Sequence, residues 1–351
     1  MDRRRFLTTA TLALAGARVT AESSVPSRIR AAQIGTGHAH AAGKMQAMRN
    51  LPDAYEVIGI CEPDNALWKR AAKDKVYAEI PRLTLDGILS SDAKLVAVET
   101  EIGQAPEMAT RCLEAGKNIH LDKPGALAHA DFKRLRLLAE QKALQLQMGY
   151  MLRYNPAFVL LFQAAREGWL GEITSIDASM GKLADPALRK ELAALPGGGM
   201  FELACHLTDA VVSLLGKPES VQAISTPTAS DGMKDNQLAI FRYPKATATL
   251  RCNHADPFGG PHRRFQVTGT TGSIEIVPLE SGNLILSLTS DHGPYKKGQT
   301  ELKLDVPKGR YDAEFVDLAN AIRGEKSLSW DAAHDIAVHE TVLRSAGLEP
   351  N

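Results

Sequence analysis

Short apolar runs alternate with amphipathic segments through the first half of the chain. The runs have the length of buried strands, and the segments between them have a helical periodicity. We expect strands at residues 29–34, 55–61, 95–98, 119–121 and 144–148. Strands that alternate with helices in this way build a parallel sheet through right-handed crossovers.

The alternation changes beyond residue 150, where strand-like runs follow one another from about residue 220 to 305. Short connections that contain Gly or Pro link many of these runs, which favours an antiparallel sheet. Helices are expected at about residues 156–167, 186–194, 200–215, 315–322 and 332–343. The predicted fold class is α/β, with an N-terminal parallel-sheet domain at residues 28–150 and a C-terminal α+β domain with a large, mostly antiparallel sheet at residues 151–345.

The first 21 residues have the order of a signal peptide. Three arginines, Arg3 to Arg5, precede a modest apolar run, and small residues follow it up to Ala21. The run is too short to span a bilayer, and the paired arginines match the twin-arginine form. A disordered basic tail is the alternative. We expect export in the folded state, to the periplasm or outside the cell.

Composition excludes several classes of function. The 351 residues carry no net charge, so nothing indicates binding to nucleic acid or to an anionic membrane surface. The four cysteines are scattered, with no C-x-x-C spacing, and are expected to be packed thiols rather than metal ligands. No metal site is expected. His254, His262, His334 and His339 have no evident partner in the sequence and are interpreted as surface or packing residues.

A glycine turn connects the first strand to a helix. The turn Gly35-Thr36-Gly37-His38 has the first two glycines of a dinucleotide-binding loop, which permit a tight turn and a close approach of the backbone to a pyrophosphate. The third glycine is missing, and His40 stands in its place. The strand–turn–helix context nevertheless predicts a Rossmann domain.

An acidic residue, Glu62, follows the second strand, where a cofactor's ribose would lie. Its carboxylate would accept a hydrogen bond from a 2′-hydroxyl and would repel a 2′-phosphate, so NAD is favoured over NADP. The alternative is a helix cap, since Pro63 could begin a helix. Thr100 follows the third strand at the same edge of the sheet and is assigned to the cofactor site as well.

The strand at residues 119–121 ends in Asp122-Lys123-Pro124. A lysine at the carboxyl end of a parallel strand lies where open α/β sheets bind ligands, which makes Lys123 a candidate catalytic residue. An ordinary surface loop is the alternative. Farther on, Glu202 and His206 are four residues apart on one expected helix. A carboxylate at that spacing can orient an imidazole and stabilise its charged form.

These motifs occur in the order found in the Gfo/Idh/MocA family of nicotinamide-dependent oxidoreductases, which the chain resembles over nearly its whole mature length. The resemblance implies that Lys123 lies beside nicotinamide and substrate, and that His206 carries the proton. Two positions depart from the family pattern: Asp122 replaces a glutamate, and Glu202 replaces an aspartate. Family members often pair through the large sheet, so a homo-oligomer, dimer or tetramer, is implied.

The resemblance also places Arg153 near the substrate, with a structural salt bridge as the alternative, and Asp209 on a helix face near the site. The expected reaction is hydride transfer between a secondary alcohol of a sugar or polyol and tightly bound NAD. Either Lys123 or His206 could be the base. The alternatives are a glycosidase that works by transient oxidation and elimination, and a non-catalytic nucleotide-binding protein.

Overall fold

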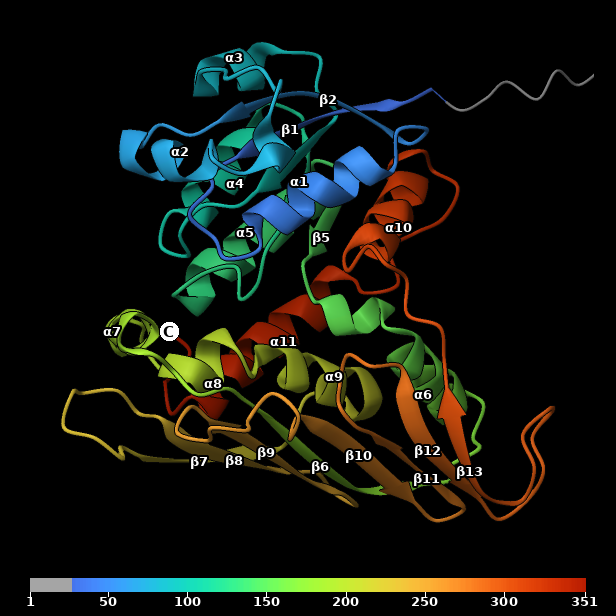
Figure 1. Cartoon of the computed structure of the whole chain (residues 1–351). Helices are drawn as coiled ribbons and strands as arrows, with labels where there is room; N and C mark the ends of the chain where they lie inside the picture. The colour runs from blue at the N-terminus through green and yellow to red at the C-terminus, as the bar shows by residue number, and fades with distance from the viewer. Residues whose placement is uncertain (1–26) are drawn as a thin grey trace, which may run out of the picture.

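The computed structural model describes residues 27–351, and the expected signal peptide lies outside this range. The described chain forms three layers, which are a parallel sheet with its helices, a middle layer of helices and a second large sheet (Figure 1). Among residues 27–351, no helix combines the length and apolar character needed to cross a membrane.

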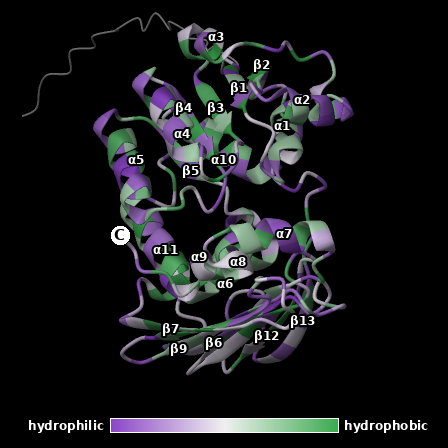
Figure 2. Ribbon diagram, turned by 90° about the vertical axis from the view of Figure 1, so that its left-hand side faces the viewer, coloured by the Kyte–Doolittle hydropathy of each residue, from purple (hydrophilic) through white to green (hydrophobic). Residues whose placement is uncertain are grey.

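All five strands of the first sheet run parallel, in the order β2-β1-β3-β4-β5. Every residue of β3 is buried, as expected where helices cover both faces of a parallel sheet. Figure 2 shows α4 and α5 on one side of this sheet and α1 on the other. The strands are β1 (Ile29–Ile34), β2 (Tyr55–Cys61), β3 (Leu95–Val98), β4 (Asn118–Leu121) and β5 (Leu146–Met148).

The helices of this half follow the strands in sequence. They are α1 (Ala41–Asn50), α2 (Asn65–Ala71), η1 (Lys75–Tyr77), α3 (Leu85–Ser90), α4 (Ala105–Glu114) and α5 (His129–Gln141). The short helices α2 and α3 were not expected, because each has too few turns to show a clear apolar periodicity. Capping side chains mark their starts: Asp64 accepts from Ala66 and Leu67, and Thr84 accepts from Gly87.

The second sheet has eight strands in the order β13-β12-β11-β10-β6-β9-β8-β7. All neighbours are antiparallel except β6 and β9, which confirms the expected mostly antiparallel sheet. Buried residues alternate with partly exposed ones along β8 and β12, so one face packs under the helices. The strands are β6 (Ile173–Gly181), β7 (Ser220–Thr226), β8 (Asn236–Arg242), β9 (Thr247–Asn253), β10 (Arg264–Gly269), β11 (Gly272–Ile276), β12 (Asn283–Leu288) and β13 (Gly298–Lys303).

The middle layer contains helices from the second half of the chain (Figure 1). Two of its members return to the first domain, since α10 packs on α1 and α11 packs on both α5 and α9. One continuous apolar core therefore extends through the domains. The helices are η2 (Met151–Tyr154), α6 (Pro156–Arg166), α7 (Pro186–Ala194), α8 (Gly198–Glu202), α9 (Cys205–Leu215), α10 (Asp312–Ile322) and α11 (Ala332–Ser345).

The expected single helix at residues 200–215 is wrong. Helix α8 ends at Glu202, and α9 begins at Cys205. The break coincides with a contact from the other domain: the carbonyl oxygen of Glu202 accepts a hydrogen bond from Nζ of Lys123 at 2.7 Å. The carbonyl group of Glu202 is thus hydrogen-bonded to a lysine far away in the sequence and not to an N–H group of the same helix. No residue near position 202 indicates this contact in the sequence.

Candidate active site

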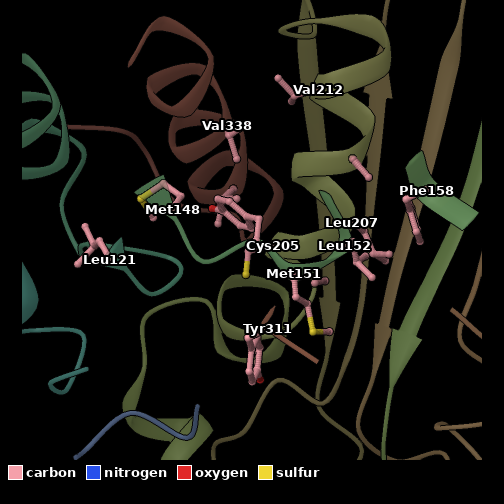
Figure 3. Close-up of a cluster of buried hydrophobic side chains, with 14 of the residues drawn as sticks. Leu121, Met148, Met151, Leu152, Phe158, Cys205, Leu207, Val212, Tyr311 and Val338 are labelled. Atoms are coloured by element: carbon pink, nitrogen blue, oxygen red, sulfur yellow. The ribbon is translucent and has the colours of Figure 1, made fainter. Parts of the chain in front are cut away.

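The site lies where the carboxyl ends of β1 and β4 face α8 and α9. Buried apolar side chains hold these elements together, and Figure 3 shows them gathered from β4, β5, α9 and α11 as Leu121, Met148, Cys205 and Val338. Because this packing is continuous with the core, the groups at the strand ends have fixed positions relative to those on the two helices.

The loop after β1 requires a glycine at position 35 and leaves little room for a side chain at position 37. Gly35 has a φ of 90°, and a Cβ there would lie 2.6 Å from the backbone nitrogen of Thr100. A Cβ at Gly37 would lie 3.0 Å from Cγ of Glu101. The missing side chains leave the backbone of the loop open to a ligand, as a dinucleotide pyrophosphate requires.

Glu62 connects the loop to the end of β2. Its Oε2 accepts hydrogen bonds from the backbone N–H of Thr36 at 2.7 Å and from Oγ1 of the same residue at 2.8 Å. The alternative role as a helix cap is excluded, because α2 begins only at Asn65 and the Asp64 carboxylate caps it. Glu62 lines a cavity of about 290 Å³ together with Gly35, Gly37 and Thr100.

These features fit the adenosine half of NAD. The glycine cradle would receive the pyrophosphate, and Glu62 and Thr100 face the neighbouring cavity. The His38 ring contacts protein and not only the cofactor site. Its Nε2 lies 3.2 Å from the carbonyl oxygen of Lys123, so the ring connects the glycine loop to the end of β4. Burial, only partly offset by Asp122, lowers the pKa of His38 to about 4, so this ring is neutral.

Lys123 is fully buried and fixed by Glu202. Its Nζ lies 2.5 Å from Oε1 of Glu202 and 2.7 Å from the carbonyl oxygen of the same residue. Burial would lower the pKa of Lys123, but Glu202, with smaller effects from Cys205 and Asp122, outweighs burial and raises this pKa above its ordinary value. The partner responds in the opposite direction, and Lys123 lowers the pKa of Glu202 to about 2 against the effect of burial. The pair is therefore an ammonium and a carboxylate at neutral pH.

Glu202 does not orient His206, and that expectation is wrong. The break between α8 and α9 removes the shared helical face, and the Glu202 carboxylate is occupied by Lys123. His206 is 1% exposed, and its Nδ1 has no hydrogen-bond partner among residues 27–351. Burial, followed by the charge of Lys123, holds the pKa of His206 well below its usual range. His206 is thus a neutral imidazole in the site.

Arg153 and Asp209 form a buried ion pair rather than an open substrate contact. Nε of Arg153 lies 3.0 Å from Oδ2 of Asp209, and Nη2 lies 2.6 Å from Oδ1. The same Nη2 donates to Asp335 at 2.7 Å, and the guanidinium lies over the Trp330 ring. The structure therefore supports the salt bridge that was the alternative for Arg153, and Asp209 belongs to the same network.

The four histidines without assigned partners divide into two groups. His254 and His339 are fully buried packing residues, as expected. The other two have carboxylate partners that the sequence did not indicate: His262, a surface residue as expected, lies 2.8 Å from Asp256, and His334 lies 3.3 Å from Asp209. These partners are distant in sequence or lie across a loop, so helical or strand periodicity does not indicate them.

Two residues that depart from the usual motifs meet in space. Nδ1 of His40, which replaces the third glycine, lies 3.1 Å from Oδ2 and 3.2 Å from Oδ1 of Asp122. Burial would raise the pKa of Asp122, but His38, His40 and Lys44 together hold it well below its usual range. The sequence showed each departure separately, and their pairing was missed.

His38, His40 and Asp122 offer ligand atoms that all lie within 4.8 Å of one another, close enough for a metal ion. The ammonium of Lys44, 3.7 Å from Oδ2 of Asp122, already neutralises this carboxylate. A backbone N–H also occupies Nδ1 of His38, since His40 donates to it at 3.2 Å. We therefore assign no metal to this cluster.

A buried polar network continues beneath the loop. Lys44 forms an ion pair with Glu314 of α10, and His120 lies between Glu314 and Glu99, 3.4 Å and 3.6 Å from their carboxylates. Burial, reinforced by the nearby Asp122 charge, raises the pKa of Glu99 to about 7. The network connects the end of β3 to helix α10 of the second half of the chain.

Comparisons with known proteins agree with this geometry. A family model described as "Oxidoreductase family, NAD-binding Rossmann fold" matches residues 29–150, and the GFO/IDH/MocA C-terminal domain matches residues 158–275. The uncharacterized oxidoreductase YhhX of Escherichia coli strain K12 is 32% identical over 253 residues, which are 70% of each chain.

One further relative and one protein of the same fold are named for an activity. The scyllo-inositol 2-dehydrogenase (NADP(+)) IolW of Bacillus subtilis strain 168 is 25% identical over 225 residues, 63% of this chain and 61% of that protein. The structure of a levoglucosan dehydrogenase in complex with NADH and levoglucosan has the same fold, with a TM-score of 0.79 at 20% identity over 92% of this chain and 98% of that one. The protein belongs to the Gfo/Idh/MocA family of oxidoreductases and has the family's NAD-binding Rossmann domain.

Proposed function

We propose that the protein is a dehydrogenase that transfers a hydride between a secondary alcohol carbon of a sugar or polyol and NAD. The observation that carries the proposal is the fixed ammonium of Lys123 at the carboxyl edge of the parallel sheet, next to the glycine loop. Support for the substrate class comes from relatives named for scyllo-inositol and levoglucosan.

Bound NAD supplies the hydride acceptor at C4 of its nicotinamide ring. Lys123 supplies a hydrogen bond to the reacting oxygen: two of its three N–H groups are directed at Glu202, which leaves one donor. An ammonium aimed at the oxygen stabilises the negative charge that develops there as the hydride leaves. The raised pKa of Lys123 keeps it protonated, so it donates a hydrogen bond to the oxygen and does not act as the base.

The preference for NAD over NADP follows from Glu62. Its buried carboxylate would lie close to a 2′-phosphate and would repel it, whereas a 2′-hydroxyl can donate to the one acceptor position on Oε1 that Thr36 and Asp64 leave free. The deciding experiment is mass spectrometry of the nucleotide released on denaturing the purified protein. We expect NAD or NADH. A preparation that contains neither of these two forms contradicts the proposal.

A second candidate function is favoured by the twin-arginine pattern of residues 1–21, which we propose directs export of the folded protein. Outside the cytoplasm free NAD is scarce, so a cofactor that stays bound suits a glycosidase that oxidises and then reduces its substrate in one turnover. The holoenzyme incubated with aryl glycosides separates the two functions. Release of the aglycone without net NADH indicates the glycosidase, and an oxidised sugar indicates the dehydrogenase.

We also propose that the outer face of the eight-stranded sheet joins two copies of the chain. Leu238 and Ile240 of β8 and Ile285 of β12 alternate with buried residues, so they lie on the face turned away from the helices. These apolar side chains are only partly exposed, and a second sheet would cover them. Light scattering on a chromatography column measures the mass directly, and a monomer contradicts this assembly.

A further inference from the structure

Three imidazoles lie at the site, and both ring nitrogens of His38 are already engaged, Nδ1 by the backbone N–H of His40 and Nε2 by the carbonyl oxygen of Lys123. Of the other two, His40 has a carboxylate partner and His206 has none among the described residues. The ring centroids of His40 and His206 are 6.4 Å apart, with an angle of 32° between the rings. The charge of Lys123 also acts on His206, so the two rings and this ammonium belong to one cluster. Their surroundings differ in the property that decides which ring can take up a proton, namely a negative charge next to the imidazole.

His40 has this partner in a rigid setting. Asp122 follows β4 directly, its Oδ1 accepts the backbone N–H of Lys123 at 2.7 Å, and its carboxylate is buried. Because a carboxylate only accepts hydrogen bonds, Nδ1 of His40 carries the proton that is shared with Asp122. Nε2 is then left with its lone pair, and the side chain of His40 is 16% exposed, so this ring is open to a ligand or to water.

The other candidates lack one requirement each. His206 is buried, and the charge of Lys123 stands beside it without a carboxylate bound to its ring, which disfavours an imidazolium. Lys123 is already protonated and held by Glu202, so it has no lone pair to offer. The charged and titratable groups that face His40 from the elements around it are Asp122, His38, Lys44, Lys123, Glu202, His206 and Tyr311.

We propose that His40, positioned by Asp122, is the proton acceptor for the alcohol in this enzyme, and that His206 serves as a neutral hydrogen-bonding group. The proposal rests on the proposed dehydrogenase function. As the C–H bond breaks, the hydride with its electron pair goes to C4 of the nicotinamide, the O–H proton goes to Nε2 of His40, and the C–O bond becomes a carbonyl. Asp122 stabilises the resulting imidazolium, which returns its proton to water at the exposed edge of the ring.

The first test needs no substrate. In the NAD-bound protein, 15N NMR of the histidine rings distinguishes the Nδ1–H from the Nε2–H tautomer. We expect His40 to be the Nδ1–H tautomer, and we expect Asp122→Asn to abolish this preference, because an amide can also donate to the ring. An Nε2–H tautomer for His40 in the unaltered protein overturns the proposal whatever the substrate.

The second test measures turnover of scyllo-inositol and levoglucosan by the holoenzyme over a range of pH. We expect His40→Gln to lower kcat about 100-fold, with bound NAD and melting temperature unchanged, and imidazole in the buffer to restore part of the activity of His40→Gly. The exposed His262→Gln serves as the matched control and should behave as the unaltered protein.

The outcomes separate the two proposals. A His40→Gln variant that keeps kcat within about threefold and retains the pH profile overturns the role of His40 while leaving the dehydrogenase in place. Loss of NAD from His40→Gln assigns the residue to the loop structure and also overturns its role as acceptor. If the unaltered protein oxidises neither sugar, the substrate proposal fails, and the NMR result still decides whether His40 and Asp122 form the expected pair.

Discussion

Lys123 binds Glu202 twice, through the carboxylate at 2.5 Å and through the backbone carbonyl at 2.7 Å. One residue of the second domain thereby fixes both the charge and the direction of the lysine. The same contact coincides with the end of α8, so the helix break and the fixed position of the ammonium involve the same residue.

Replacing Lys123 by Met should lower kcat about 100-fold or more, because the reacting oxygen loses its charged donor. Bound NAD should be retained, since the glycine loop and Glu62 do not depend on the ammonium. Glu202→Gln should have a smaller effect, as an amide still accepts a hydrogen bond from Nζ. A double-mutant cycle of these two variants measures their coupling, and additive losses in kcat would contradict a shared function.

Replacing Glu62 by Gln should narrow the preference for NAD over NADP, because the repulsion of the 2′-phosphate is removed. Dissociation constants for both nucleotides, measured on protein stripped of cofactor, check this. The control is Asp74→Asn, a capping carboxylate at the start of η1 that does not line this cavity. If the ratio of the dissociation constants for NADP and NAD is the same in Glu62→Gln as in the unaltered protein, Glu62 does not determine the preference for NAD.

The buried Glu99 should make the protein less stable as the pH rises from about 4.5 to about 7. Its pKa is raised in the folded state, so in this window the folded chain binds more protons than the unfolded chain does. The stability from this group is fully present below pH 4.5 and is lost as the pH passes the folded pKa of about 7. Urea unfolding at several pH values should show a flatter dependence for Glu99→Gln, and identical slopes in both proteins contradict the assignment.

Replacing Arg153 by Met should destabilise the protein by about 3–5 kcal/mol, since Asp209 and Asp335 would be left as buried carboxylates without their guanidinium. The Michaelis constant of the fraction that remains folded should change little, because Arg153 is enclosed by protein. Urea unfolding and steady-state kinetics test both statements. A large rise in the Michaelis constant with normal stability would restore the substrate-binding role.

Replacing Arg4 and Arg5 by lysine should abolish export, because the twin-arginine pathway recognises the paired guanidinium groups. Cell fractionation followed by immunoblotting locates the protein. Equal amounts outside the cytoplasm for both forms contradict the twin-arginine assignment.

Local patterns in the sequence were sufficient to predict both sheets and the positions of the loop glycines, Glu62 and Lys123. The patterns repeat over a few residues, and each of these groups lies at the end of a strand with a clear apolar run. The break at Glu202 and the network around Arg153 could not be predicted in this way. Their causes are hydrogen bonds between residues 56 to 182 positions apart, which leave no periodic trace.

The roles of the two histidines show the same limit. The spacing in the sequence predicted a contact between His206 and Glu202. In the structure Glu202 contacts Lys123, and His40 contacts Asp122. Each residue was visible in the sequence as part of a motif or as a departure from one. The pairing of carboxylates with cations depends on how the two domains pack against each other. Local sequence patterns do not determine that packing.

The ion pair between Lys44 and Glu314 has a consequence for how the protein is made. Lys44 is fully buried on α1, and its counter-charge comes from α10, 270 residues later in the chain. A chain that extends only as far as β5 keeps Asp122 beside this ammonium but lacks the ion pair with Glu314, and the side of α1 that packs on α10 is uncovered. The packing of the nucleotide-binding half is therefore complete only once α10 has been made and has docked on α1.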